Sequence, residues 1–368
     1  MAKDMKEIME RISGFLPEGS DRTIVYCGEA DIVPDLAGRF EKVYFKSETD
    51  SPEYENVQCC LPGDRRVPRE TVDLVINFNE RSLFDDADGN FNMPCYKLGQ
   101  LLKAGRYMVS AFESGALEPE FGNKVCEAYL RAGLQDPVCT AADDLTIVSA
   151  VRARDPDEKK KEVYGIWNAW APNYDDYHKD ELATENLDLW RSVLKRVIAA
   201  PAGAKMLDIG TGTGFLSVMA AEIGYDSYGI DLSEQMLEYA KKHSAERKAP
   251  VTLIRGDGDR LPFEDGTFAA VMNSRVLWTC VDPCASLREW MRVAAPGGRI
   301  ISFTRTGEEV ARENGMMDSM LPMSNAVTGD YVRVYQEAGL KNVTCEKLPE
   351  EMSVLAGPVW YVISGDKE

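Results

Sequence analysis

The C-terminal part of the chain alternates short apolar runs with longer segments of helical periodicity. Such alternation is typical of a parallel sheet whose strands are joined by helices on both faces. We expect strands at 205–210, 226–230, 251–254, 268–273 and 299–303, and a closing pair at 342–348 and 359–364. Helices are expected at 215–223, 233–247 and 285–293, and Ser233 suits the N-cap of the second. The pattern predicts a doubly wound α/β domain.

The N-terminal part repeats this order in weaker form. The matching pairs are 23–28 with 205–210, 42–45 with 226–230, 60–68 with 255–262, 72–77 with 268–273, 103–109 with 296–302, and 129–134 with 335–340. Matches in the same order favour an internal duplication. The alternative is that two α/β domains share generic strand and turn chemistry.

A charged segment at 154–162 separates the two parts and resembles a linker or a solvated first helical turn. It defines two domains, 1–155 and 156–368, each long enough to bury a core of its own. We therefore expect two tandem Rossmann-like doubly wound sheets, the second closed by an antiparallel strand.

Composition excludes several classes of protein. The 368 residues carry a formal net charge of -19 without a basic stripe, which argues against a nucleic-acid partner. No apolar run is long enough to span a membrane, and the N-terminus lacks an apolar signal core, so we expect a cytoplasmic protein. Nine cysteines, an odd number, fit free thiols, and two histidines exclude a histidine-rich metal site. We expect no metal; Cys280 and Cys284, at helical spacing, fit buried small residues better than a two-ligand site.

The strongest chemical signal is the segment 208–214, Asp-Ile-Gly-Thr-Gly-Thr-Gly, between a predicted strand and a predicted helix. Its glycines permit left-handed backbone angles and let a ligand approach the main chain closely. Dinucleotide enzymes carry GxGxxG, but Phe215 stands where the third glycine of that motif belongs. The spacing favours a nucleoside ligand without pyrophosphate.

Carboxylates follow the next two strands. Asp231 ends the second strand and can accept hydrogen bonds from both hydroxyls of a ribose. Asp257 follows the third strand and is placed to receive an amino group such as that of adenine. Leu232 and Met236 are candidates to sandwich the base.

Residues 163–304 resemble class I S-adenosylmethionine-dependent methyltransferases of the ubiquinone/menaquinone type (methyltransferase type 11). The matching segments are 170–175 (WAPNYD), 207–214 (LDIGTGTG), 229–233 (GIDLS), 256–257 (GD), 261–263 (LPF) and 296–298 (PGG). The resemblance implies S-adenosylmethionine as the cofactor and methyl transfer to a small molecule as the activity.

The resemblance also implies roles for individual residues. The implied cofactor-binding set is Tyr174, Asp208, Gly210, Thr211, Gly212, Asp231, Leu232, Met236, Asp257, Gly258 and Asn273. Within it, Tyr174 closes over the cofactor, and Asp257 with the Gly258 amide binds adenine. Two members have alternative roles: Asp208 could brace the loop without touching the cofactor, and Asn273 could cap the end of a strand.

Aromatic and basic residues surround the expected mouth of this site. Trp167, Trp170 and Tyr174 recur at three- and four-residue spacing, and Tyr177 follows them. They either dock a helix on the sheet or form a lid over an apolar or planar acceptor. Arg275 and Arg305 follow the fourth and fifth strands and are candidates for an acidic substrate. His178 is a candidate base, although a solvent-facing helix position also explains it.

The N-terminal copy departs from the motif. Glu29, Ala30 and Asp31 follow Gly28, and no acid stands in the register of Asp231. We expect this degenerate copy to bind no cofactor and to serve as a structural partner, a substrate-side wall or the surface of a homodimer. Two rival functions remain: a cofactor-binding regulator without methyl transfer, and a nicotinamide-dependent oxidoreductase, which Phe215 disfavours.

Overall fold

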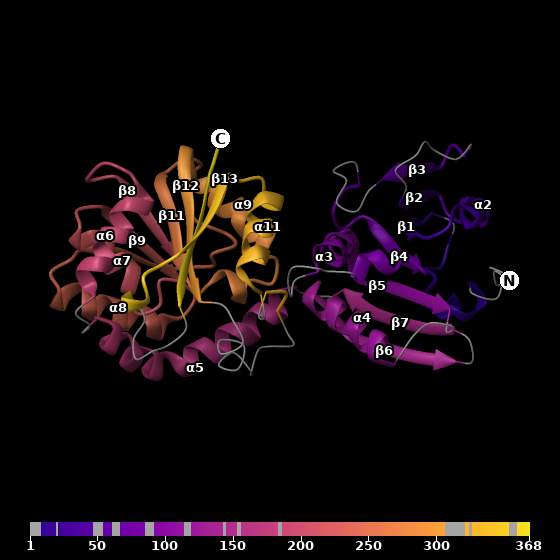
Figure 1. The fold of residues 1–368 in the computed structure, drawn as a ribbon, viewed down its shortest axis with the longest axis horizontal. Coiled ribbons are helices and arrows are strands. Elements are labelled where there is room, and N and C mark those ends of the chain that lie inside the picture. The colour runs from indigo at the N-terminus through magenta and orange to yellow at the C-terminus, as the bar shows by residue number, and fades with distance from the viewer. Residues whose placement is uncertain are drawn as a thin grey trace. The chain divides into compact units, whose positions relative to one another are not determined.

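The computed structural model divides the chain into two compact units, Met1–Pro156 and Asp157–Glu368 (Figure 1). It describes residues 9–19, 21–46, 54–60, 67–84, 92–113, 119–142, 145–152, 156–182, 186–305, 321–323, 326–352 and 359–368. Each unit contains one seven-stranded sheet, so the predicted fold class, two tandem doubly wound α/β sheets, is confirmed.

The sheet of the second unit has the strand order β10-β9-β8-β11-β12-β14-β13. The strands are β8 (Lys205–Ile209), β9 (Asp226–Asp231), β10 (Val251–Arg255), β11 (Phe268–Ser274), β12 (Ala294–Arg305), β13 (Lys341–Lys347) and β14 (Trp360–Asp366). All neighbours are parallel except β14, which pairs antiparallel with both β12 and β13. The predicted closing antiparallel strand is thereby confirmed.

Helices connect these strands. They are α5 (Pro156–Leu182), α6 (Leu187–Ile198), α7 (Phe215–Glu222), α8 (Glu234–Glu246), α9 (Pro283–Val293) and α11 (Thr328–Ala338). The predicted N-cap is confirmed, because the Ser233 hydroxyl accepts a hydrogen bond of 3.2 Å from the amide of Met236. Within the charged segment, residues 156–162 form the start of α5, a helix of 27 residues.

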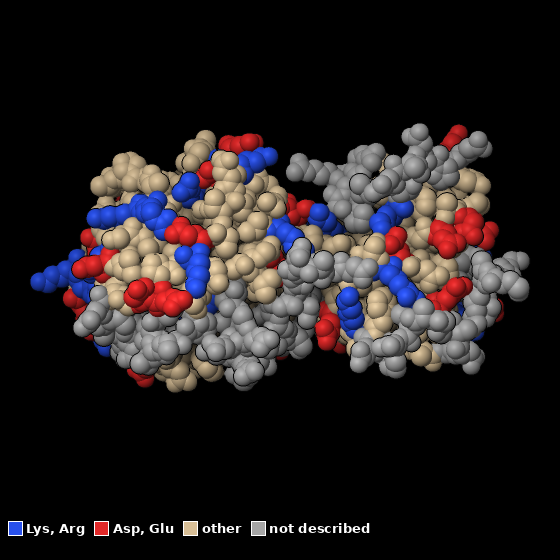
Figure 2. Space-filling view, viewed as in Figure 1, with Lys and Arg blue, Asp and Glu red and all other residues tan. Residues whose placement is uncertain are grey.

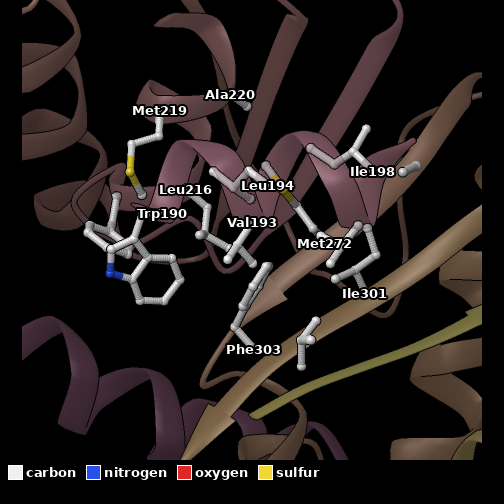
Figure 3. Close-up of a cluster of buried hydrophobic side chains, with 14 of the residues drawn as sticks. Trp190, Val193, Leu194, Ile198, Leu216, Met219, Ala220, Met272, Ile301 and Phe303 are labelled. Carbon is white, nitrogen blue, oxygen red and sulfur yellow. The ribbon is translucent and has the colours of Figure 1, made fainter. Parts of the chain in front are cut away.

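The core of the second unit lies where α6 and α7 pack on the sheet. Figure 3 shows Trp190 of α6 beside Leu216 and Met219 of α7, with Phe303 of β12 facing them. The ring of Trp190 makes edge-to-face contacts with the rings of Phe215 and Trp360, at centroid distances of 5.1 and 5.2 Å. The packed Phe215 is the first residue of α7, so this core lies directly behind the Gly-rich loop that joins β8 to α7.

The first unit has the same strand order, β3-β2-β1-β4-β5-β7-β6. Its strands are β1 (Thr23–Cys27), β2 (Lys42–Lys46), β3 (Val57–Cys60), β4 (Val72–Phe78), β5 (Leu102–Glu113), β6 (Leu134–Ala142) and β7 (Leu145–Arg152). Its helices are α2 (Val33–Ala37), α3 (Met93–Gly99) and α4 (Pro119–Arg131). Here β7 is the strand that runs antiparallel to both neighbours.

The two units share a buried polar chain that an α/β fold does not require. In the first, Asn77 of β4 donates to Ser110 of β5 at 3.0 Å, and the serine hydroxyl lies 2.6 Å from the hydroxyl of Tyr129. In the second, Asn273, Ser302 and Tyr335 form the same chain at 2.7 and 2.6 Å.

Unusual backbone angles also recur at matching places. Asn79 and Arg275, each two residues beyond these asparagines, have φ of 54° and 59°. Asp136 and Asn342, each three residues beyond a left-handed glycine, have φ of 50° and 48°. Few non-glycine residues adopt positive φ, so these matching positions are a further similarity between the two units.

Among the described helices, none is long and apolar enough to cross a membrane. On the face drawn in Figure 2, the described basic and acidic side chains are interspersed and form no continuous basic stripe.

Candidate functional site

The site begins with the Gly-rich loop between β8 and α7. Gly210, Gly212 and Gly214 have φ of 58°, 55° and 92°, in the left-handed region that glycine adopts without strain. A Cβ at Gly210 would lie 2.6 Å from the side chain of Val276. The loop therefore needs glycine for its backbone angles and for its close contacts.

Asp208 braces this loop from behind. Its side chain is 2% exposed and accepts hydrogen bonds from the Thr211 hydroxyl at 2.8 Å and the Ser217 amide at 3.1 Å. Burial raises the pKa of Asp208 to about 7, although these hydrogen bonds oppose the rise. Asp208 and Thr211 do not line the cavity in front of the loop. Their placement favours the bracing role that the sequence left open.

Asp231, at the end of β9, faces the cavity. One carboxylate oxygen accepts a hydrogen bond from the Gly212 amide at 2.9 Å, and the other accepts one from the Ser233 amide at 2.8 Å. Burial raises the pKa of Asp231 against these backbone hydrogen bonds. Because each carboxylate oxygen has a second lone pair, both can still accept from a ligand's hydroxyl groups.

The expected adenine end of the cavity lies at the turn after β10. Asp257 accepts a hydrogen bond of 2.9 Å from the Asp259 amide, and the Gly258 carbonyl accepts one of 2.9 Å from the Trp290 indole. Leu232 and Met236 line the same cavity. The structure thus brings together the residues predicted to bind the ribose and those predicted to bind the base.

Helix α5 covers this cavity with aromatic side chains. Trp167 and Tyr174 line it and contact each other edge-on at 5.7 Å between centroids. Tyr174 also lies against the Gly-rich loop, because a Cβ at Gly212 would be 3.4 Å from its ring. This is the arrangement expected of a residue that closes over a cofactor.

The helical face differs from the prediction at Trp170. Trp170 is 46% exposed and does not line the cavity, whereas Val163, Tyr164, Trp167 and Tyr174 of the same helix do. The side chains of Tyr177 and His178 lie outside the described part of the structure, so their proposed roles stay predictions.

Among the candidate residues on β11 and β12 or directly after them, Arg275 lines the cavity, but Arg305 and Asn273 do not. Asn273 is 1% exposed and donates to Ser302. Its position within the sheet favours the role at a strand end over direct contact with a ligand.

Sequence reasoning missed Lys160 and Asp259. The Lys160 ammonium lies 3.1 Å from a carboxylate oxygen of Asp257 and 2.6 Å from one of Asp259. Burial lowers the pKa of Lys160, but the two carboxylates raise it more, and the net shift is upward. The available signal was the only run of three lysines in the chain, at 159–161, which resembles a linker because its neighbours are also charged.

Of the two cysteines near the site, Cys280 lines the cavity and Cys284 does not. Cys280 and Cys284 are buried, and their thiols lie 3.7 and 3.8 Å from the carbonyl oxygens of Val276 and Val334. In the described residues, no group of three or more His, Cys, Asp or Glu side chains is arranged to hold a metal ion.

The sequence of the second unit also matches a known protein family. Residues 207–302, which run from β8 through the Gly-rich loop to β12, match the family model of the methyltransferase domain. The family match, the sheet order and the loop identify the second unit as a class I S-adenosylmethionine-dependent methyltransferase domain.

Curated relatives of this domain are bacterial demethylmenaquinone methyltransferases. The enzyme of Renibacterium salmoninarum is 33% identical over 145 residues, which are 39% of this chain and 59% of the relative. That of Clavibacter sepedonicus is 38% identical over 120 residues, 33% of this chain and 49% of the relative. The chain thus spans about half to three fifths of the relatives that it matches.

Solved structures of methyltransferases are also similar. A S-adenosylmethionine-dependent methyltransferase from Aquifex aeolicus has a TM-score of 0.43 and 19% identity, covering 55% of this chain and 98% of its own. Phosphoethanolamine N-methyltransferase 2 of Haemonchus contortus, in complex with S-adenosylmethionine, has a TM-score of 0.43 and 14% identity, covering 98% of both chains.

Proposed function

We propose that the chain transfers a methyl group from S-adenosylmethionine to a small-molecule acceptor. The observation that carries the proposal is one cavity in which the bare main chain of Gly210 and Gly212 meets the carboxylates of Asp231 and Asp257. Main-chain groups without Cβ atoms suit the methionyl and ribose portions, and the two acids suit the ribose hydroxyls and the adenine amino group. The residues present therefore fit the cofactor.

When bound, S-adenosylmethionine supplies a methyl group that its sulfonium already activates. The task of the protein is to orient an acceptor in line with the bond to that methyl group and to exclude water. Such positioning can lower a barrier by roughly 7–11 kcal/mol. Trp167 and Tyr174 supply an apolar cover for this purpose. A general base is needed only for an acceptor that is protonated at the working pH.

The curated relatives are named for demethylmenaquinone, which suggests a small-molecule acceptor for this chain as well. The aromatic cover of the cavity is compatible with a planar acceptor. We propose a small molecule rather than a macromolecule, because a small acceptor can be enclosed beneath α5.

The first unit is, in this proposal, a degenerate copy of the second that binds no cofactor. The shared strand order, the shared Asn–Ser–Tyr chain and the matching left-handed positions support duplication. At Gly28, which corresponds to Gly210, a Cβ would lie 2.4 Å from the Tyr26 hydroxyl. A tyrosine hydroxyl thus lies against the start of the loop where the second unit leaves a cavity.

Binding of S-adenosylhomocysteine and radiolabelled methyl transfer into a metabolite extract test the proposal together. Replacing Asp231→Ala should weaken S-adenosylhomocysteine binding by about 1.5–3 kcal/mol, because charged hydrogen bonds to the ribose are lost. Asp226→Ala, at the exposed start of the same strand, is the matched control and should bind like the wild type.

The outcomes separate the candidate functions. Label in small molecules supports the proposal, whereas label in protein bands contradicts the small-molecule acceptor. Tight binding without any transfer would favour the regulator, and stabilisation by NAD but not by S-adenosylhomocysteine would favour the oxidoreductase.

A further inference from the structure

Two arginines stand side by side at the carboxyl ends of β11 and β12. Arg275 is the first residue after β11, and Arg305 is the last residue of the neighbouring strand β12. Parallel strands of α/β proteins present their ligand sites at this edge of the sheet.

Trp360 organises the pair. It is the first residue of β14, is 2% exposed and is the register partner of Arg305. The guanidinium carbons of Arg275 and Arg305 lie 5.1 and 5.4 Å from the centroid of its ring, and that of Arg275 also lies 5.3 Å from the ring of Tyr174. We call Arg275, Arg305 and Trp360 the arginine platform. Contact with a ring orients a guanidinium and leaves its edge suited to a bidentate anion.

The first unit shows that the fold does not require this platform. Arg275 and Asn79 occupy equivalent positions: their amides donate to the carbonyls of Phe303 and Ala111, at 2.8 and 3.0 Å. Their φ angles, 59° and 54°, are left-handed. Asparagine tolerates this conformation well and arginine has no special preference for it, so the backbone alone favours asparagine.

The other two members of the platform are also replaced by different residue types at the equivalent positions of the first unit. Arg305 lies two residues beyond Phe303, where the first unit has Glu113, two residues beyond Ala111. Trp360 pairs with Arg305, and Leu145 pairs with Glu113. The unit with the cavity thus carries Arg, Arg and Trp where the other carries Asn, Glu and Leu. Two like charges near one ring repel each other, which an anionic ligand relieves.

We propose that the arginine platform binds a carboxylate or phosphate group of the methyl acceptor. This inference rests on the proposed methyl transfer and adds the chemical class of the substrate. Arg275 lines the cavity and Arg305 lies outside it, so a group held by both extends beyond the cofactor's crevice toward the acceptor's side. Both arginines have further local contacts, and the incoming anion adds to these contacts or replaces them. The methionyl carboxylate of the cofactor has the same chemistry, so the test separates the two sources.

The test uses the full chain and the variants Arg275→Asn and Arg305→Gln. Asparagine is the residue that the first unit places at the same left-handed position, so this variant should fold. Arg255→Gln is the control, since Arg255 is exposed and paired with Glu234 on the surface. Methyl label is transferred into a metabolite extract, products are separated by anion exchange, and inorganic phosphate is the competing probe.

We expect labelled products to be retained on the anion exchanger and phosphate to inhibit transfer. Each platform variant should lower kcat/KM for the retained products by on the order of ten- to a hundredfold and weaken phosphate inhibition similarly. S-adenosylhomocysteine affinity should change less than about threefold, and the Arg255 control should match the wild type.

Products that all pass unretained, or variants that leave kcat/KM unchanged, would overturn the proposal. A loss of S-adenosylhomocysteine affinity with unchanged acceptor KM would assign the platform to the cofactor's carboxylate instead, and so refute an acceptor site. Failure of the wild type to bind S-adenosylhomocysteine would instead refute the proposed function itself.

Discussion

Asp175 of α5 and His243 of α8 form a buried side-chain pair that ties the covering helix to the Gly-rich loop. The His243 Nε2 atom lies 3.0 Å from a carboxylate oxygen of Asp175, and the two side chains are 5% and 1% exposed. The other ring nitrogen lies 3.0 Å from the carbonyl oxygen of Thr213 within the loop. Tyr174, which lies over Gly212, is the neighbour of Asp175 in the chain, so the pair helps to fix the cover of the cavity.

Removing this pair should destabilise the second unit. Asp175→Ala leaves a buried ring nitrogen of His243 without its partner, and loss of a buried polar partner costs about 1–3 kcal/mol. Urea unfolding measures the loss. Asp176→Ala, the exposed neighbour, should change the free energy of unfolding by less than about 0.5 kcal/mol. Equal effects of both variants would contradict a structural role of the pair.

Lys160 should slow release of the cofactor. Its ammonium bridges Asp257 and Asp259 and so holds the first turns of α5 against the adenine end of the cavity. The groups are partly exposed, so Lys160→Met should raise the dissociation rate of S-adenosylhomocysteine only about two- to fivefold at low salt. Stopped-flow displacement measures this rate. The exposed Lys161→Met is the control, and an unchanged rate for Lys160→Met would contradict this role of Lys160.

Asp208 should make stability depend on pH. Because burial raises its pKa from 3.8 to about 7, the folded protein holds this proton more tightly than the unfolded chain does. The contribution to stability is full below about pH 4 and is lost as the pH rises through 7. Asp208→Asn removes this dependence, so its free energy of unfolding relative to the wild type should rise by about 2–3 kcal/mol between pH 5 and pH 8. The exposed Asp226→Asn should show no such trend, and a constant difference for Asp208→Asn would contradict the raised pKa.

The full chain should bind one S-adenosylhomocysteine. Tyr26 lies against Gly28 in the first unit, whereas the second unit leaves its loop open to the cavity. Isothermal titration should give one site per chain, and Asp231→Ala should weaken that single site. Two sites, or a site of wild-type affinity that survives in Asp231→Ala, would refute the degenerate first copy.

Several elements were predictable because their signals are local. The predicted strand at 226–230 corresponds to β9 at Asp226–Asp231, and the Ser233 cap follows from a hydroxyl placed three residues before an amide that needs a partner. The face of α5 was less predictable. Trp170 has the spacing of a lid residue, but which stripe of a long helix turns inward depends on what the helix packs against.

The sequence alone determined the Gly-rich loop, the acids that end β9 and follow β10, and the succession of strands and helices in the second unit, because each depends on residues that are neighbours in the chain. Only the tertiary structure decided that Asp208 braces the loop while Asp231 faces the cavity, and that Lys160 meets Asp257 across 97 positions of the chain. Contacts of that kind depend on how α5 lies over the sheet, and no local pattern records the position of a helix on a distant surface.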